Sequence, residues 1–466
     1  MLRKKYEFDK EFGVVIQLIG EMDDSISLID KVLEDEYLFR LVESDLSKRY
    51  QNTTKTGRKS TPVEVILRIL TLKHLRGWSY DQTILNVNES LILRQFCRVY
   101  FQTLPDKSTL IRWSHVICQE TLEQLNQRLI TIATQLQITQ GKKLRTDGTV
   151  VATNIHFPSD NTLLVDAVKV ISRFLSQVKV ILQDNKNISS TLFRNRYRTA
   201  RRISRQIDSL SKTRNQSGRQ KREQAYSKLI EVASCCLKQA QKMKIILENL
   251  NSSNTVNLLQ NFVIFIPRIQ QVIEQTRRRI LSQEKVPSSE KIVSIFETHT
   301  DIICRGKINV DVEFGHKVWL DEVDGGMISN YRILKGNPHD TQQLIPSLDQ
   351  HVKNFGHPPK ILTTDRGVYS NTNEQYASDI GVKEVVLPKG GYRSKERIQH
   401  ERKRKFKKAR HWHNGVEGRI SFLKRCFGFQ RCLYRGELGF SRWIGWGVFA
   451  HNLTIISRKT EKVSSN

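Results

Sequence analysis

A short apolar run, PKILTTD at residues 359–365, has the pattern of a buried β-strand that ends in a carboxylate. Helical patterns lie on either side of this run, at 341–354 and 374–380, and another strand pattern follows at 383–387. Strands that alternate with helices in this way are typical of an α/β layer. We therefore expect an α/β fold in which Asp365 lies at the carboxyl end of a strand, the edge where such sheets place their sites.

An earlier stretch, LRTDGTVVATNIHF at residues 144–157, is rich in β-branched residues and contains Asp147 directly before Gly148. Because Asp-Gly is a frequent turn sequence, we expect a strand over 142–146, a turn, and a second short strand. Asp147 would then end its strand. Strand patterns return from about residue 291 and extend the same α/β layer.

A long helical stretch at 162–290 interrupts this layer. Seven residues within it recur at heptad-like spacing, namely Leu229, Val232, Cys236, Ala240, Met243, Leu247 and Leu250. This pattern predicts a helix that packs lengthwise against a neighbour. The neighbour is either a return helix after a turn at 251–254 or a second copy of the chain at a dimer interface.

These patterns predict four parts of the chain. They are a helical N-terminal domain (1–140), an α/β core (141–161 and 291–450), a helical insertion (162–290) and a C-terminal tail (451–466). In the N-terminal domain, Asp106 or Ser108 of the run LPDKSTLIR can cap a helix that carries Arg112. We interpret it as the last helix of a helix-turn-helix, which would place Arg112 at DNA. The alternative is an ordinary helical bundle.

The charge of the chain limits its partners. Its 466 residues include 76 Lys and Arg against 47 Asp and Glu, a formal net charge of +29, which favours a polyanion such as nucleic acid. No apolar stretch of about 18 residues and no secretory signal are visible, so we expect no spanning helix. The most basic stretches of the chain lack the interleaved apolar face that membrane insertion requires, so we expect no membrane contact. The seven cysteines are scattered, without a CxxC pair, which fits a reducing cytoplasm.

Three acids have the context expected of metal ligands. Asp147 and Asp365 follow strand patterns, and Glu417 lies in HNGVEGR at 413–419, at the predicted start of an amphipathic helix. Two aspartates from adjacent strands and a glutamate from a crossing helix can surround two Mg²⁺ ions, which prefer oxygen ligands. Taken singly, each acid is more often a turn or surface residue. Asp321, Glu322 and Asp324 form a second acidic cluster, which we interpret as structural.

Two basic windows accompany these acids. Residues 194–228 hold 12 Lys and Arg against two acids, and residues 389–410, which we expect to form a loop, hold 11 against two. From them we expect DNA phosphate contacts by Arg198, Arg201, Arg202, Arg205, Arg402, Lys403 and Arg404. Lys424 lies seven residues after Glu417, on the same helix face, and with Arg419 would extend this surface. The alternative for each charge is a solvated position.

Three strings resemble the acidic motifs of DDE-type insertion-sequence transposases. They are LRTDGTVVATNIHFPSDNTLL, ILTTDRGVYSN and RHWHNGVEGRISFLKRCFG, and the last has the Glu-x6-Lys spacing of that family. The chain is most similar to the ISNCY-type group, which it also resembles in LPDKSTLIR, SIFETHTDIICRGK, EFGHKVWLDEVDGG and LKGNPHDT. The resemblance covers roughly residues 60–450.

The resemblance implies a ribonuclease H-like core, a mixed sheet with flanking helices, in which Asp147, Asp365 and Glu417 bind two Mg²⁺ ions, with Mn²⁺ as a substitute. It implies cleavage at the ends of a mobile element and joining to target DNA, by a cytoplasmic, nucleoid-associated protein that forms a homo-oligomer on double-stranded DNA. The third motif departs from the common pattern Tyr-x2-Arg-x3-Glu. Here His413 and Asn414 stand in that region and are candidates for DNA contact in place of the Tyr and Arg.

Two other functions remain open from the sequence. One is a catalytically inactive or domesticated relative that binds DNA as a regulator. The other is a ribonuclease H-like nuclease that cuts DNA without joining it, since both reactions use the same metal chemistry.

Overall fold

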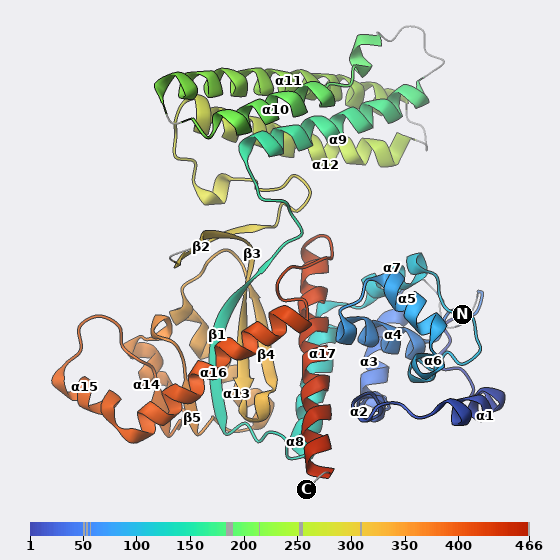
Figure 1. Cartoon of the computed structure of the whole chain (residues 1–466), viewed down its shortest axis with the longest axis vertical. Helices are drawn as coiled ribbons and strands as arrows, with labels where there is room; N and C mark the ends of the chain where they lie inside the picture. The colour runs from blue at the N-terminus through green and yellow to red at the C-terminus, as the bar shows by residue number, and fades with distance from the viewer. Residues whose placement is uncertain are drawn as a thin grey trace. The chain divides into compact units, whose positions relative to one another are not determined.

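The computed structural model describes all residues except 50–51, 53–54, 56, 183–189, 214, 251–254, 308–309 and 465–466. The chain forms two compact units, unit 1 (Met1–Asn154 with Ile303–Asn466) and unit 2 (Ile155–Ile302). Figure 1 shows the course of the chain through both. The turn predicted at 251–254 lies outside the described residues.

Unit 1 is built on a mixed six-stranded sheet. The strand order is β2-β3-β1-β5-β6, and β4 also pairs with β3. Strand β1 is antiparallel to β3 and parallel to β5, β3 is antiparallel to β4, and β5 is parallel to β6. The strands are β1 (Lys143–Ala152), β2 (Asp301–Lys307), β3 (Val310–Val323), β4 (Ile328–Leu334), β5 (Ile361–Thr363) and β6 (Glu384–Val386). The predicted α/β class with a mixed sheet is confirmed.

Helices cover both faces of this sheet because its strands alternate apolar residues between the faces. Val151, Val318 and Leu320 pack against the ends of α16 and α17. Leu144 and Trp319 belong to the core on the other face, with α13 and α14. Figure 1 shows α16 crossing the sheet beside β1 and β5. The helices are α13 (Leu344–Phe355), α14 (Asn371–Asp379), α15 (Lys395–Arg402), α16 (Arg404–Cys426) and α17 (Glu437–Ser464).

Helix α17 replaces the predicted C-terminal tail. Residues 451–464 continue this helix, and Leu453 and Ile456 are buried. Helix α17 packs on α2, α4 and α8, so it joins the N-terminal helices to the sheet. The side-chain amide of Asn452 donates to Asn126 of α8 (2.6 Å) and to the Ile328 carbonyl of β4 (2.9 Å).

The N-terminal region is helical, as predicted. Asp106 is the N-cap of α7 and accepts a bond from the Thr109 amide (2.8 Å), and Gly77 ends α4 with φ 67°. Nearly all of α4 is buried, so it is the central helix of this region. The helices are α1 (Lys10–Ile19), α2 (Asp24–Val32), α3 (Glu36–Ser47), α4 (Val63–Arg76), α5 (Tyr80–Glu89), α6 (Leu91–Phe96), α7 (Lys107–Val116) and α8 (Gln119–Gln135).

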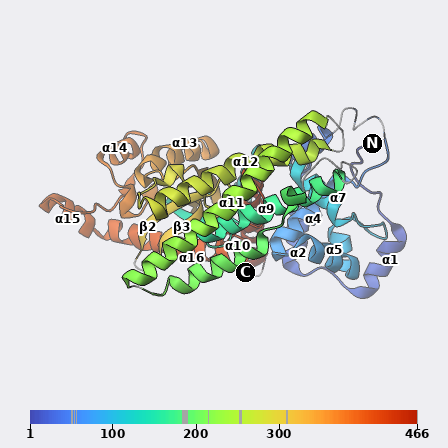
Figure 2. The same cartoon turned by 90° about the horizontal axis from the view of Figure 1, so that it is seen from above.

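Unit 2 consists mainly of four helices that lie side by side in both views (Figures 1 and 2). They are α9 (Asp160–Ile181), α10 (Tyr197–Leu210), α11 (Gln216–Leu250) and α12 (Val256–Thr276). Five residues of the predicted heptad seam are buried on α11, which packs against the other three helices; they are Leu229, Cys236, Ala240, Met243 and Leu247. The partner of the seam is therefore within the same chain.

Two predicted segments differ from the structure. The strand expected from residue 291 begins only at Asp301, after an irregular stretch. The loop expected at 389–410 contains α15 and the first turns of α16, because Phe406 and Ala409 are buried against the sheet. Within the described residues, no helix has both the length and the apolar character needed to span a membrane.

Candidate active site at the sheet edge

Asp147 lies within β1, and Asp365 follows the neighbouring parallel strand β5 at a corresponding level. The pairing of β1 with β5 ends at Arg145 opposite Thr363, and each aspartate lies two residues beyond that pair. Alternate residues share a face of a sheet, so Asp147 lies on the same face as Arg145, which contacts α16. The register therefore places the two aspartates at the same level along β1 and β5, with Asp147 on the face of the sheet that α16 contacts.

Asp147 lies within a strand and not at a turn, which corrects the prediction from Asp-Gly. Strand β1 continues to Ala152, and Gly148 pairs with Trp319 of β3. A Cβ on Gly148 would lie 3.2 Å from the Trp319 ring, so glycine here gives the indole room. A glycine at this position lets the Trp319 ring pack against β1. A local sequence pattern does not reveal this contact, because Trp319 is distant in sequence.

Asp365 lies among other charges. Its side chain accepts a bond from the Gly367 amide (3.0 Å). Although solvent reaches the side chain, partial burial raises its pKa, and the Asp340 carboxylate raises it further. Asp340 in turn forms an ion pair with Lys317 of β3. Neither residue was predicted as part of the site, although Asp340 belongs to the LKGNPHDT string.

Glu417 lies in the middle of α16 rather than at its start. The side chain is exposed, and the described residues offer it no hydrogen bond or ion pair. One helical turn earlier, the buried His413 lies with its Nδ1 3.4 Å from the Thr363 hydroxyl of β5. Burial, with Arg145 and Arg410 nearby, lowers the pKa of His413 to about 4. His413 therefore anchors the helix to the sheet and is not exposed for DNA contact.

Arg145 connects α16 to the sheet. Its guanidinium donates to both Glu322 oxygens (2.9 and 2.7 Å) and to the Trp412 carbonyl, and it lies over the Trp412 ring at 4.8 Å. A Cβ on Gly415 would lie only 2.6 Å from Arg145 Nη1. Gly415 of the HNGVEGR motif thus permits the close approach of helix and arginine.

Arg419 faces the protein and is not part of an exposed basic surface. Its Nε donates to Glu322 (3.1 Å), and its Nη1 lies 3.2 Å from His451 of α17. Glu322 therefore accepts bonds from two arginines, and the Asp324 carboxylate accepts bonds from the Gln140 and Lys143 amides (2.9 and 3.0 Å). These contacts agree with the structural role predicted for the second acidic cluster.

Two family models match the chain. The model described as "Transposase domain (DUF772)" matches residues 15–115, which run from α1 to α7. The model described as "Transposase DDE domain" matches residues 322–453, which include Asp365, Glu417 and the whole of α16. The chain belongs to the DDE-type insertion-sequence transposases. No curated protein and no solved structure matches it.

The transposase domains make this chain an enzyme of the DDE type, a family that generally uses divalent metal ions. Asp147 and Asp365 fit such an ion in chemistry, because both supply hard oxygen ligands, and the strand register places them at the same level along β1 and β5. Among the described residues, however, no three His, Cys, Asp or Glu side chains come together closely enough to hold one ion. Glu417 is placed on the adjacent helix but does not complete a cluster with the aspartates.

Two exposed groups of cations lie on the transposase. On α10, Ala200, Ile203 and Ile207 are buried, while Arg198, Arg201, Arg202 and Arg205 are exposed on the other side of the helix. At the junction of α15 and α16, Arg402, Lys403 and Arg404 are exposed. Other cations of the second window are used structurally, because Arg393 and Arg397 bind Glu401 (3.0 and 2.9 Å).

The remaining predicted DNA contacts are distributed over unit 1. Arg112 is exposed on α7, where its guanidinium donates to the Thr109 hydroxyl (2.9 Å). Asn414 is exposed on α16, and Lys424 is half-buried two turns after Glu417. Apart from His413 and Arg419, the described residues predicted to contact DNA are thus at least partly accessible.

Proposed function

We propose that this transposase cuts the ends of a mobile DNA element and joins them to target DNA by Mg²⁺-dependent phosphoryl transfer. The observation that carries the proposal is the matching level of Asp147 in β1 and of Asp365 just after the parallel strand β5, beside the helix that carries Glu417. We assign these three acids as metal ligands, for two Mg²⁺ ions or for Mn²⁺ in their place. Membership of the ISNCY-type group and a cytoplasmic, nucleoid-associated setting remain predictions.

The sheet supports a ribonuclease H-like core as part of this proposal. Strands β4, β3, β1, β5 and β6 lie side by side in that order, with β1 antiparallel to β3 and parallel to β5. The proposed core consists of residues 141–161 and 291–450. It follows a helical N-terminal domain, and α17 packs against helices of that domain. The insertion at 162–290 and α7 with Arg112 would contact the duplex in a homo-oligomer that holds two ends.

The residues have distinct tasks in this reaction. When bound, the metal pair activates the attacking oxygen and stabilises the leaving oxygen of a phosphodiester. Asp147 and Asp365 hold their positions through the strand register, and Asp365 is fixed further by the Gly367 amide. Arg145 and His413 hold α16 against β1 and β5, which positions Glu417 relative to the aspartates.

Substitution of the three acids tests the proposal. Asp147→Asn, Asp365→Asn and Glu417→Gln should each reduce Mg²⁺-dependent cleavage of element-end DNA by at least about 100-fold, because each removes a charged ligand. Duplex binding in a mobility-shift assay should change little. Mn²⁺ titration of the DNA-free protein, followed by electron paramagnetic resonance, should show fewer or weaker bound ions.

Matched controls are Asp379→Asn at the end of α14 and Glu231→Gln on α11, which change exposed acids that are not among the proposed ligands. Full activity and full Mn²⁺ binding in any of the three test variants would remove that acid from the site. A wild-type protein that binds element ends but never cuts them would be a regulator. One that cuts without forming joined products would be a nuclease.

A further inference from the structure

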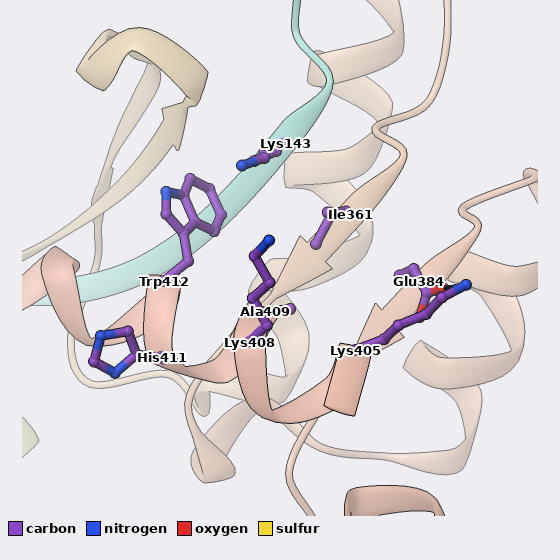
Figure 3. A pocket seen from close by; sticks show the side chains of 8 residues that line it. All are labelled: Lys143, Ile361, Glu384, Lys405, Lys408, Ala409, His411 and Trp412. Atoms are coloured by element: carbon purple, nitrogen blue, oxygen red, sulfur yellow. Dashed lines mark ion pairs between the residues drawn. The ribbon is translucent and has the colours of Figure 1, made fainter. Parts of the chain in front are cut away.

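A cavity of about 510 Å³ lies between α16 and the first residues of β1, β5 and β6. Figure 3 shows its lining, which consists of Lys143, Ile361, Glu384, Lys405, Lys408, Ala409, His411 and Trp412. Lys143 and Ile361 begin their strands, whereas the two aspartates lie four residues further along. The cavity is therefore about 13 Å of strand away from the level of the two aspartates, whereas its Trp412 precedes Glu417 by five residues on α16.

The chemistry of the lining is both cationic and aromatic. Three lysines border the cavity, and Glu384 is paired with only one of them, Lys405 (3.2 Å). Lys143 Nζ lies 5.7 Å and the Arg145 guanidinium 4.8 Å from the centre of the Trp412 ring, so a base would use the ring surface that these two cations leave uncovered. In Figure 3, the Lys408 ammonium points into the space between Trp412 and Ile361. The cavity thus offers an excess of positive charge together with an indole ring and an apolar surface.

We propose that this cavity holds one unpaired nucleotide of a DNA strand, with its base against Trp412 and its phosphate on Lys143 and Lys408. The inference rests on the proposed function, because it takes DNA as the substrate. Sites for unpaired strands combine aromatic side chains, on which bases stack, with cations that follow the backbone. A simple anion would use the lysines but not the indole, and a base that is stacked and paired inside a duplex cannot lay its face against Trp412.

The surroundings of the cavity support a strand as the ligand rather than a free nucleotide. The exposed Arg402, Lys403 and Arg404 precede the lining residues on the same stretch of chain, so neighbouring phosphates have further cations available. At 3.4 Å per nucleotide, a strand that ends at Asp147 and Asp365 reaches the cavity with about four nucleotides. The site would therefore hold a strand that leaves the duplex near the cleavage point.

Competition binding with matched DNAs tests the proposal. We compare a blunt element-end duplex with the same duplex extended by four unpaired nucleotides, and with one whose unpaired nucleotides are abasic. The wild-type transposase should bind the extended DNA roughly tenfold more tightly than the blunt DNA, and the abasic extension should lose most of this preference. The abasic arm needs no protein variant, so it is independent of folding.

Protein variants test whether the preference for the extended DNA arises from the cavity. Trp412→Ala and Lys408→Gln should reduce it to about twofold, whereas Trp412→Phe, which keeps an aromatic face, should retain most of it. Lys407→Gln is the matched control, because Lys407 is an exposed neighbour on α16 that does not line the cavity. It should weaken binding of both DNAs equally.

Three results would overturn the inference. They are equal binding of blunt and extended DNA by the wild type, an unchanged preference in both Lys408→Gln and Trp412→Ala, and displacement of the extension by equimolar free deoxynucleotide. In each of these cases the proposed function survives. Failure to bind any element-end duplex would instead contradict the proposed function itself.

Discussion

Individual contacts of Arg145 determine how α16 lies on the sheet. This arginine pairs with Glu322, which is 177 positions away in sequence, and its guanidinium fits against Gly415 because that residue has no side chain. Two glycines of the HNGVEGR motif therefore have different roles. Gly415 faces Arg145, whereas a Cβ on Gly418 would meet nothing within 4 Å.

This difference gives a matched pair of substitutions. Gly415→Ala should displace the buried guanidinium from Glu322 and cost about 1–3 kcal/mol of unfolding free energy, with loss of cleavage. Gly418→Ala should leave stability unchanged or raise it by about 0.5–1 kcal/mol, because alanine favours a helix. Urea unfolding of both variants measures the difference. Equal effects of the two substitutions would contradict the role given to Gly415.

The buried His413 makes stability depend on pH. Its pKa is about 4 in the folded protein, against about 6.5 when unfolded, so between these values the unfolded chain binds more protons. The folded state is therefore fully stabilised above pH 6.5 and loses stability as the pH falls towards 4. From pH 7 to pH 5 we expect this residue to account for about 2 kcal/mol.

His413→Gln removes this titration while keeping a polar partner for Thr363. Unfolding by urea at pH 7 and pH 5 should then show a smaller loss of stability than in the wild type. His411→Gln, an exposed neighbour, is the control and should behave like the wild type. The same loss in His413→Gln as in the wild type would show that His413 does not titrate as described.

Among the helices and strands, local sequence patterns predicted those whose formation depends on residues close in sequence. Apolar periodicity predicted the strand before Asp365 and the seam of α11, and Asp106 caps α7 as expected. The patterns failed where a contact with a residue distant in sequence determines the local structure. Gly148 lies in a strand, where it pairs with Trp319 of β3, and the basic stretch 389–410 is helical because buried apolar residues and Glu401 hold it.

The same limit applies to the candidate site. The order and context of the three acids were visible in the sequence, but Asp340 and Lys317 were not, because their proximity to Asp365 arises from the fold. The inward orientation of His413 and Arg419 likewise depends on Thr363 and on Glu322, on other strands.

We expect the exposed arginines of α10 to contact DNA phosphates. These four arginines form one face, so replacing Arg201, Arg202 and Arg205 with Gln should remove up to three phosphate contacts. The slope of log K against log salt should then become shallower by up to about 2.7. Lys238→Gln with Lys242→Gln, on exposed positions of α11, is the control. An unchanged slope in the arginine variant would exclude this face from DNA binding.

The whole molecule has two units with separate hydrophobic cores. Residues 155–302, which form unit 2, hold 25 Lys and Arg against 12 Asp and Glu, so they carry +13 of the net +29. Unit 2 buries its own apolar residues among α9 to α12. The positive charge is thus shared between two bodies, each stabilised independently.

Because each unit has its own hydrophobic core, we expect two thermal unfolding transitions. Leu229→Ala removes a fully buried side chain in unit 2, and Leu129→Ala does so in α8 of unit 1. Each should cost about 2–5 kcal/mol in its own unit and lower only one transition in calorimetry. A single transition lowered by both substitutions would show that the units unfold together.

The position of unit 2 within the chain also affects biosynthesis. Leu144 of β1 pairs with Val323 of β3, and the 148 residues of unit 2 are translated between these two strands. At about 5–20 residues per second, the ribosome needs roughly 10–35 seconds to supply that partner. During this interval the nascent chain can complete the helical bundle while β1 has an unpaired, aggregation-prone edge. The sheet, and with it the aspartate pair, forms only late in synthesis, and α17 completes it last.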